Sequence, residues 1–336
     1  MVIRIMSIFI KFILLLNFLI LFATGSALSV TTEQSFDEWL SSYKKFALKK
    51  GISKQTLEVA FKDVKFLENV IKYDRKQPEF FEDTLTYVGK RASKKRAILA
   101  NRLLKSNSQL FLKVESNFNV EKEILLALWG IETNFGKHVG KMDIISSLAT
   151  LTYDKRRSKF FSSELISLLR LIDKNIINPN TLYGSWAGAY GNFQFMPSTI
   201  TRYAIDYDNN NKIELKESLD DALASAANYI NKIGWKKGEP CFFRVKINKK
   251  IEDKYFNSSA RKISNKLKIS EWKQKGVVNF DGSELKTNFK AALILPDGKP
   301  NSPMYLVFGN YQKILKWNRS LRFGISVCTL AEMIKA

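Results

Sequence analysis

Histidine and cysteine are almost absent from this 336-residue chain, which has one histidine, His138, and two cysteines, Cys241 and Cys328. A zinc site needs several His, Cys or carboxylate ligands, and a Ser-His-Asp triad needs a histidine beside its serine. One histidine leaves almost no material for either, so acid–base chemistry must come from carboxylates. The two cysteines could pair in an oxidising compartment or remain as buried free thiols, and the sequence leaves both open.

Acidic residues are also scarce, with 32 Asp and Glu against 54 Lys and Arg, which gives a formal net charge of +22. This balance favours a polyanionic partner such as nucleic acid, acidic lipid or an acidic cell-wall polymer. A Lys-rich bias of the whole proteome would produce the same excess. Internal repeats and low-complexity tracts are absent from the sequence, and a hydrophobic content of 45% is typical of a globular protein.

The N-terminus has the features of an export signal. Arg4 and Lys11 precede and interrupt an apolar stretch, Phe12–Phe22 is almost wholly apolar, and Gly25-Ser26-Ala27 supplies the small residues of a cleavage site. We therefore expect residues 1–27 to be a signal peptide and the mature protein to be periplasmic, which argues against nucleic acid as a partner. Ile8–Phe22 approaches the roughly 20 apolar residues of a membrane span, so an uncleaved anchor stays open. The lack of a cysteine near the cleavage region excludes a lipoprotein anchor.

Hydrophobic periodicity divides the rest of the chain into four parts. Helical spacing of apolar residues predicts an N-terminal helical region over residues 28–118 and a central helical region over 119–240. Residues 241–308 predict a small β-rich unit, and residues 309–336 a helical return. The expected strands are Phe242–Ile247, Val277–Phe280, Ala291–Leu295 and Tyr305–Phe308. The predicted fold class is therefore mainly α (α+β), with an inserted β-rich unit.

The central region begins with a helix that we expect to be buried on all sides. Asn119 can cap this helix, with Glu121 and Glu123 in its first turn, and every residue of Ile124–Ile131 is apolar or glycine. Glu132 falls at the end of this apolar stripe, where the loss of water raises the pKa of a carboxyl group. A glutamate that keeps its proton near neutrality can donate it to a glycosidic oxygen. The alternative is a helix-terminal glutamate that faces solvent.

The sequence around Glu132 resembles the lytic murein transglycosylase B family. The blocks that carry the resemblance, in this order and spacing, are Trp129–Gly136, Ser147–Leu151, Tyr153–Arg157, Gly184–Ser198, Asp221–Leu223, Ala227–Tyr229, Gly234–Trp235 and Trp317–Ser320. The resemblance implies a lysozyme-like core at residues 119–240. It also implies an enzyme that cleaves the MurNAc–GlcNAc β-1,4 bond of peptidoglycan glycan strands and leaves 1,6-anhydro ends, with no cofactor needed for the chemistry.

The resemblance also implies roles for individual residues. Glu132 takes the place of the single catalytic acid. The residues implied to contact the substrate are Ser185, Gln194, Arg156, Arg157, Tyr229, Asn318 and Tyr87. The two guanidinium groups suit the carboxylates of the lactyl group or stem peptide, and an exposed basic helix start is the alternative for them. Phe323 stands where the family often has tyrosine, which puts one hydroxyl contact in question.

A second motif, Asp206–Glu217, has the ligand spacing of an EF-hand calcium loop. It predicts a structural Ca²⁺ held by the side chains of Asp206, Asp208, Asn210 and Glu217 and by the backbone carbonyl of Lys212. Asn211 occupies the sixth position, where glycine normally makes the turn, and asparagine is the non-glycine residue that adopts positive φ most readily. An Asn-rich turn without a metal is the alternative.

Two other functions stay open, a non-catalytic peptidoglycan-binding protein and a muramidase-type hydrolase on the same fold. An inactive relative should have lost the acid, whereas Glu132 is present. No second carboxylate lies on a comparable motif, so schemes with two carboxylates fit poorly. Other cell-wall enzymes stay open as partners, nucleic acid is not expected, and membrane contact is expected only if the leader is uncleaved.

Overall fold

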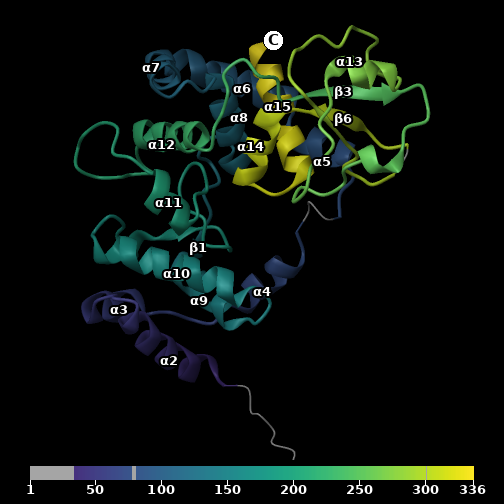
Figure 1. The fold of residues 1–336 in the computed structure, drawn as a ribbon. Helices are drawn as coiled ribbons and strands as arrows, with labels where there is room; N and C mark the ends of the chain where they lie inside the picture. The colour runs from purple at the N-terminus through teal and green to yellow at the C-terminus, as the bar shows by residue number, and fades with distance from the viewer. Residues whose placement is uncertain (1–33, 78–80, 300) are drawn as a thin grey trace, which may run out of the picture. The chain divides into compact units, whose positions relative to one another are not determined.

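Helices form most of the computed structural model, which describes residues 34–77, 81–299 and 301–336 (Figure 1). The α-helices are α2 (Phe36–Lys49), α3 (Lys54–Ala60), α4 (Glu68–Arg75), α5 (Thr84–Arg91), α6 (Lys94–Ser106), α7 (Ser108–Phe118), α8 (Lys122–Thr133), α9 (Ile144–Tyr153), α10 (Ser158–Asp173), α11 (Pro197–Tyr203), α12 (Leu219–Lys232), α13 (Ile269–Gln274), α14 (Gly309–Trp317) and α15 (Leu321–Lys335). None of those helices is long and apolar enough to span a membrane. The predicted signal peptide, residues 1–27, lies outside the described residues.

The strands form two sheets. A four-stranded antiparallel sheet has the order β4-β3-β6-β5, and its strands are β3 (Phe242–Ile247), β4 (Val277–Asn279), β5 (Ala292–Ile294) and β6 (Met304–Val307). All four strands were predicted to within one residue at either end, which confirms the inserted β-rich unit. A second pairing, between β1 (Met142–Asp143) and β2 (Tyr183–Gly184), was not predicted, because two-residue strands have no periodicity to detect.

The four-stranded sheet has a hydrophobic core of its own. Trp272 of α13 is fully buried and packs in a cluster with residues of the sheet that include Val245, Leu293 and Leu306. Its indole Nε1 donates to the carbonyl of Ala291 at 2.9 Å, so the ring is buried without leaving a polar atom unsatisfied. Burial of each such large apolar side chain contributes about 1.5–3 kcal/mol. The β-rich unit is therefore stabilised by a hydrophobic core of its own.

The residues from Leu40 to Ala336 form one compact unit, and α8 lies among its buried helices. Of the predicted buried stretch Ile124–Ile131, every residue from Ile124 to Gly130 is buried, and Ile131 is partly buried. α15 packs against α8, α5 and α6. The predicted helix start at Asn119 was wrong: Asn119 adopts φ 54° and ends α7, and α8 begins at Lys122 with Glu121 at its N-cap. Asparagine takes the left-handed conformation readily, which suits a helix C-cap better than the start of the next helix.

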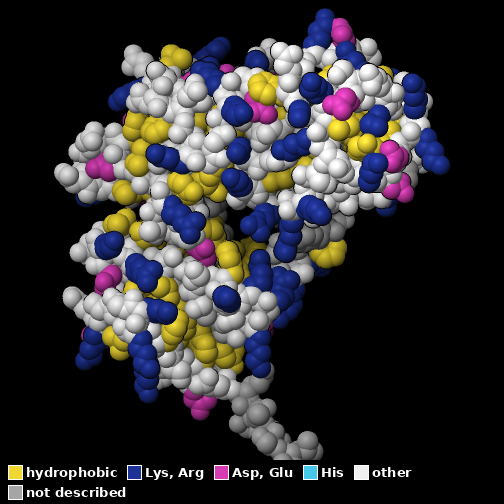
Figure 2. Space-filling view, in the orientation of Figure 1, with side chains coloured by type: hydrophobic (Ala, Val, Ile, Leu, Met, Phe, Trp, Pro, Cys, Tyr) yellow, Lys and Arg dark blue, Asp and Glu magenta, His cyan; other side chains and the backbone are white. Residues whose placement is uncertain are grey.

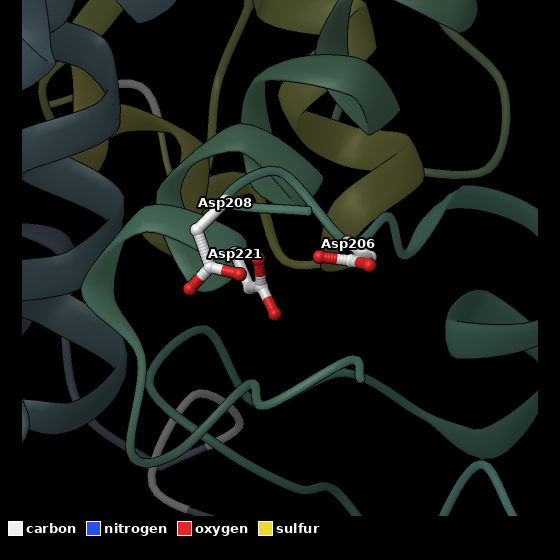
Figure 3. A group of neighbouring side chains, drawn as sticks. All are labelled: Asp206, Asp208 and Asp221. Atoms are coloured by element: carbon white, nitrogen blue, oxygen red, sulfur yellow. The ribbon is translucent and has the colours of Figure 1, made fainter. Parts of the chain in front are cut away.

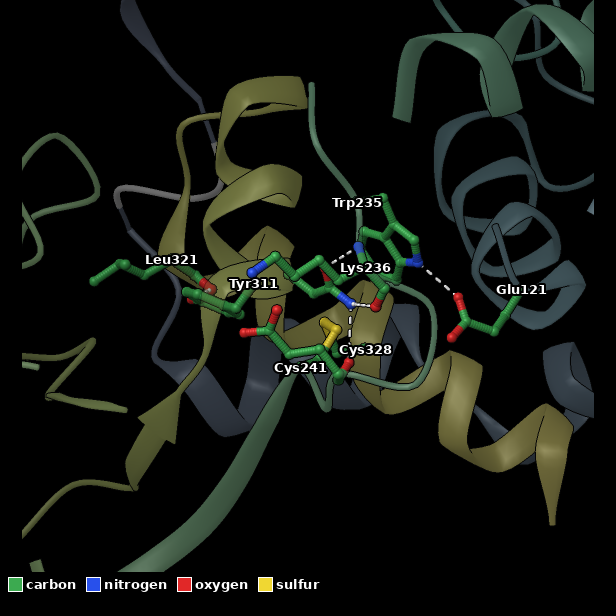
Figure 4. The surroundings of a disulfide bond; sticks show 9 residues. Glu121, Trp235, Lys236, Cys241, Tyr311, Leu321 and Cys328 are labelled. Atoms are coloured by element: carbon green, nitrogen blue, oxygen red, sulfur yellow. Dashed lines mark hydrogen bonds between the residues drawn. A yellow bond between two sulfur atoms is a disulfide. The ribbon is translucent and has the colours of Figure 1, made fainter. Parts of the chain in front are cut away.

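Cys241 and Cys328 form a disulfide bond, with their Cα atoms 6.0 Å apart (Figure 4). The sequence had left pairing and free thiols open, and the structure decides for pairing. Cys241 directly precedes β3 and Cys328 lies in α15, so the bond ties the β-rich unit to the helix that covers α8. Nearby, buried Asn310 binds the backbone of Lys236 and Glu239, which fastens the same junction by hydrogen bonds.

Candidate active site

Glu132 lies in the last turn of α8 and is only partly buried. The helix ends at the next residue, Thr133, and its C-cap Asn134 adopts φ 50°. The Oε1 atom of Glu132 accepts a hydrogen bond from the indole Nε1 of Trp317, the last residue of α14, at 2.8 Å. A carboxyl group at the end of a buried apolar helix is thus held by a residue 185 positions further along the chain. The residues around Glu132 in the sequence gave no sign of this partner.

Trp317 belongs to a cluster of aromatic rings. Tyr229 of α12 stacks on it, with ring centroids 5.0 Å apart and an interplanar angle of 21°. Tyr203 stacks on the other side of Tyr229 at 4.4 Å, and the edges of Phe195 and Phe193 meet Trp317 at 5.3 and 6.3 Å. Burial raises the pKa of Tyr229 to about 12, so its hydroxyl keeps its proton near neutrality and donates to the carbonyl of Lys316 at 3.1 Å. The predicted substrate residue Tyr229 therefore stacks directly on Trp317, the hydrogen-bond partner of Glu132.

The loop that carries Gln194 is fastened to the end of α8. Buried Asn192 accepts from Trp129 Nε1 at 2.9 Å through its side chain and from Thr133 Oγ1 at 2.8 Å through its carbonyl. Thr133 is the immediate neighbour of Glu132. Gln194 adopts φ 50°, and its Nε2 donates to the carbonyls of Gly191 and Val139 at 2.9 and 3.1 Å. The structure thus brings the predicted Gln194 loop to the Glu132 end of α8.

Ser185 follows β2 and shapes a tight turn. Its Oγ accepts hydrogen bonds from the backbone N–H groups of Ala189 at 2.9 Å and Ala187 at 3.3 Å. Gly140, which has φ 90°, lies against this segment so closely that an added Cβ would come within 2.1 Å of the Gly184 carbonyl oxygen. Only glycine fits this approach. A hydroxyl that accepts from two backbone groups still has its own proton to donate, which is the role open to Ser185 toward a ligand.

Arg156 and Arg157 bind a carboxylate of the protein itself. Asp74 of α4 is 2% exposed, and it accepts from Arg156 Nε at 2.7 Å and also pairs with Arg157. The neighbouring Arg75 of α4 forms an ion pair with Asp154 at 2.8 Å, so here α4 supplies the base and the segment before Arg156 supplies the acid. The arginine pair is therefore occupied on one side and holds α4 in place, while both guanidinium side chains stay partly exposed. The sequence gave no sign that Asp74 binds these two arginines, because no motif around Asp74 marks it as their partner.

The remaining two predicted substrate residues differ in their surroundings. Asn318 is the C-cap of α14 and directly follows Trp317, so it lies beside the aromatic cluster. Tyr87 is buried in α5, and the guanidinium of Arg91 lies 3.4 Å from the centre of its ring. Asp297 of the β-rich unit links α5 to α15. Its carboxylate accepts from the backbone N–H of Thr84 at 3.1 Å and forms an ion pair with Arg322 of α15.

Lys and Arg side chains are spread over one face of the molecule. Figure 2 shows this face hollowed between the region of α14 and the region of α9 and α10, with basic side chains along the hollow. Such a setting suits a long anionic substrate, because positive potential concentrates negative groups near the surface.

The four acidic residues that are buried in the described part of the chain all have protein partners. Asp74 binds the arginine pair, Glu164 accepts from the backbone and hydroxyl of Ser198 at 2.9 and 2.7 Å, and Glu239 accepts from Gly309 N at 2.6 Å. The fourth, Asp221, is described below. Each of these four carboxylates fastens one segment of the chain to another.

The Asp206–Glu217 loop folds as its spacing predicted at the turn. Asn211 adopts φ 69°, and the carboxylate of Asp206 accepts from the backbone N–H of Asn211 at 2.8 Å and of Asn210 at 3.1 Å. Asn210 Oδ1 accepts from Lys212 N at 2.8 Å. These bonds wrap the backbone around the first carboxylate of the loop.

The carboxylates of Asp206, Asp208 and Asp221 gather within 4.8 Å of one another (Figure 3). Asp221, in the first turn of α12, is fully buried and accepts from Tyr207 N and Glu214 N at 2.7 and 2.9 Å. The sequence had not offered Asp221 as a ligand, since it lies beyond the twelve-residue loop. The predicted twelfth ligand, Glu217, is outside this group: its side chain is 58% exposed and lies 3.6 Å from Lys216 Nζ. Three oxygen-donor carboxylates in one group fit a hard cation such as Ca²⁺.

Comparison with known proteins identifies the family. Residues 35–332 match the family model of the transglycosylase SLT domain. The chain is 30% identical over 222 residues to the membrane-bound lytic murein transglycosylase B of Escherichia coli (strain K12), a match that covers 65% of this chain and 58% of that relative's length.

Solved structures of similar fold agree. SltB3 from Pseudomonas aeruginosa, solved in complex with NAG-NAM-pentapeptide and with NAG-anhNAM-pentapeptide, is 33% identical with TM-scores of 0.82 and 0.80, over 90% of this chain and 80% of that one. The Escherichia coli lytic transglycosylase Slt35 in complex with calcium is 25% identical with a TM-score of 0.72, over 88% of this chain and 92% of that one. The fold is therefore the lysozyme-like fold that the motifs implied, and the chain belongs to the transglycosylase SLT-domain family.

Proposed function

We propose that this protein is a peptidoglycan lytic transglycosylase that cleaves the MurNAc–GlcNAc β-1,4 bond and leaves 1,6-anhydro-MurNAc ends. The observation that carries the proposal is the Glu132 carboxyl group, set at the end of a buried helix and hydrogen-bonded to Trp317 in a member of this family. The complexes of SltB3 with NAG-NAM-pentapeptide and NAG-anhNAM-pentapeptide support the same substrate and product class here.

Glu132 acts first as an acid and then as a base. Its proton passes to the glycosidic oxygen as the bond from that oxygen to C1 of the muramic sugar breaks, and the 2-acetamido group stabilises the positive charge that develops at C1. The resulting carboxylate takes the proton of the C6 hydroxyl as the C6 oxygen bonds to C1. The proton returns to Glu132 and no water is consumed. One carboxylate suffices for this scheme. This agrees with the finding that the four buried acidic residues all bind partners within the protein.

The substrate contacts follow from the free bonding capacity of the side chains. Ser185 accepts two backbone hydrogen bonds and would donate its own proton to a sugar oxygen, while Gln194 donates through Nε2 and would accept a sugar N–H or O–H through Oε1. Tyr229, Asn318 and Tyr87 would line the path of the glycan. The partly exposed faces of Arg156 and Arg157 would meet a lactyl or stem-peptide carboxylate. Figure 2 supports a basic path for such groups.

Mass analysis of the products from purified sacculi tests the function. We expect the purified protein to release muropeptides that end in 1,6-anhydro-MurNAc, which are lighter by one water than the reducing products of a hydrolase. Mainly reducing ends would replace the proposal by a muramidase. Binding to sacculi without release of any product would leave a non-catalytic peptidoglycan-binding protein.

We further propose that the group of Asp206, Asp208 and Asp221 binds a structural Ca²⁺, with Asn210 and the carbonyl of Lys212 as further ligands. The gathered carboxylates, the positive φ of Asn211 and the calcium complex of Slt35 support this site. Glu217 would need to turn inward to join it.

Calcium titration by calorimetry is expected to show one site in the wild-type protein and none in Asp208→Asn, because the exposed Asp208 supplies charge to the site with little part in the fold. Asp220→Asn removes an equal charge from the neighbouring helix start and should bind calcium as the wild type does. Calcium should also raise the melting temperature of the wild type and of Asp220→Asn, but not that of Asp208→Asn, since a ligand that binds only the folded state stabilises it. Silence of the wild type at millimolar calcium would exclude the site.

The location is proposed as the periplasm. The leader-like residues 1–27 support export, and the Cys241–Cys328 disulfide supports an oxidising compartment.

A further inference from the structure

α8 has a glutamate at each end, and each accepts a hydrogen bond from an indole. At the C-terminal end, Trp317 Nε1 donates to Glu132 Oε1 at 2.8 Å. At the N-cap, Trp235 Nε1 donates to Glu121 Oε2 at 2.6 Å (Figure 4). The other oxygen of Glu121 accepts from Gly238 N at 2.8 Å, so that carboxylate is a structural link between α8 and the segment before β3. The two pairs share their chemistry and differ in their place in the fold.

The indole of Trp317 is fixed before any substrate arrives. It stacks on Tyr229, which stacks in turn on Tyr203, and two phenylalanine edges, Phe195 and Phe193, meet it as well. The hydroxyl of Tyr229 is tied to the carbonyl of Lys316, the residue before Trp317. A ring held on several sides keeps its N–H direction, so the bond to Glu132 Oε1 is pre-organised and adds little ordering entropy on binding.

An indole nitrogen is a hydrogen-bond donor only. The Glu132 oxygen that faces it is an acceptor in both the acid and the carboxylate form. Because a carbonyl oxygen accepts more strongly than the hydroxyl oxygen of an acid, this bond favours the acid form that carries its proton on Oε2. We propose that Trp317 is a positioning residue that makes the two oxygens of Glu132 inequivalent and favours Oε2 as the atom that transfers the proton. This inference rests on the proposed function. In that scheme Oε2 gives its proton to the glycosidic oxygen and later receives the proton of the C6 hydroxyl.

The variant Trp317→Phe removes the N–H and keeps an aromatic ring in the stack. We expect kcat on purified sacculi or a defined glycan to fall roughly 10- to 100-fold with KM nearly unchanged, because the acid is misaligned while substrate contacts remain. The alkaline limb of the pH–activity profile should move to higher pH by about one unit, since a hydrogen bond to the charged form favours that form. Trp235→Phe is the matched control: it removes the same kind of bond from Glu121 and should change neither kcat nor the pH profile.

A second measurement keeps the test decisive if Trp317→Phe folds poorly. In protein labelled with ¹⁵N-tryptophan, one indole N–H signal should move as Glu132 titrates, and this movement should be absent in Glu132→Gln. If every indole signal behaves alike in the wild type and Glu132→Gln, the inference is overturned. A wild-type kcat and pH profile in folded Trp317→Phe overturns it as well, with the proposed function intact. Turnover retained by Glu132→Gln would instead reject the proposed function itself.

Discussion

Glu132→Gln will lower turnover on purified sacculi by roughly 10³-fold, within the range that general acid–base catalysis supplies. The amide has the shape of the protonated acid, and its oxygen can still accept from Trp317 Nε1. It cannot release a proton to the leaving oxygen. The fold and the affinity for glycan strands should therefore be preserved. Mass spectrometry of released muropeptides measures the first effect, and a pull-down of the variant with sacculi measures the second.

Glu121→Gln is the matched control for this experiment. Glu121 lies on the same helix and also accepts from an indole, but it holds Trp235 and Gly238 at the other end of α8. Its amide variant should be somewhat less stable, because two hydrogen bonds lose their charged acceptor, and should keep nearly wild-type turnover. Equal losses in both variants would mean that damage to α8, and not the chemistry of Glu132, explains the result.

Removal of the disulfide in Cys241→Ser/Cys328→Ser will lower the free energy of unfolding by about 4–5 kcal/mol. The bond closes a loop with a sequence separation of 87, and in the chain-entropy model a cross-link of that length restricts the unfolded chain by about this amount. For a domain of this size the melting temperature should fall by about 10 °C. Thermal unfolding followed by circular dichroism measures the shift.

Reduction of the wild-type protein provides the control for the disulfide. Dithiothreitol should bring the melting temperature of the wild type close to that of the double serine variant and leave the variant unchanged. A wild type that melts at the same temperature with and without reductant would show that packing of α15, and not the cross-link, holds the β-rich unit to the helical core.

Elements with a local signal were predictable from the sequence. The four strands of the inserted unit each combine β-branched or aromatic residues with nearby turn residues, and Ile124–Ile131 had the composition of a buried helix. The positive φ of Asn211 followed from its position in the calcium-loop spacing. In each case a few neighbouring residues decide the conformation.

Partners that meet from distant parts of the chain were not predictable in this way. Asp74 reaches the arginine pair across 82 residues, and Trp317 reaches Glu132 across 185. Asp221 joins Asp206 and Asp208 because α12 begins beside the loop, which no spacing rule within the loop records. Such contacts depend on tertiary packing, which hydrophobic periodicity does not describe. The family resemblance assigned roles to Glu132 and to several substrate residues, but it assigned none to Asp74, Trp317 or Asp221.

The separation of Glu132 from Trp317 has a consequence for the order in which the site forms during synthesis. A chain that has emerged only as far as α12 contains the glutamate without the indole that orients it and without α15, which packs against α8. Contacts between residues so far apart form late, because the intervening chain must first be brought together. A chain that is still being synthesised therefore has no completed Glu132–Trp317 pair, and that pair forms only after the residues up to α15 have emerged.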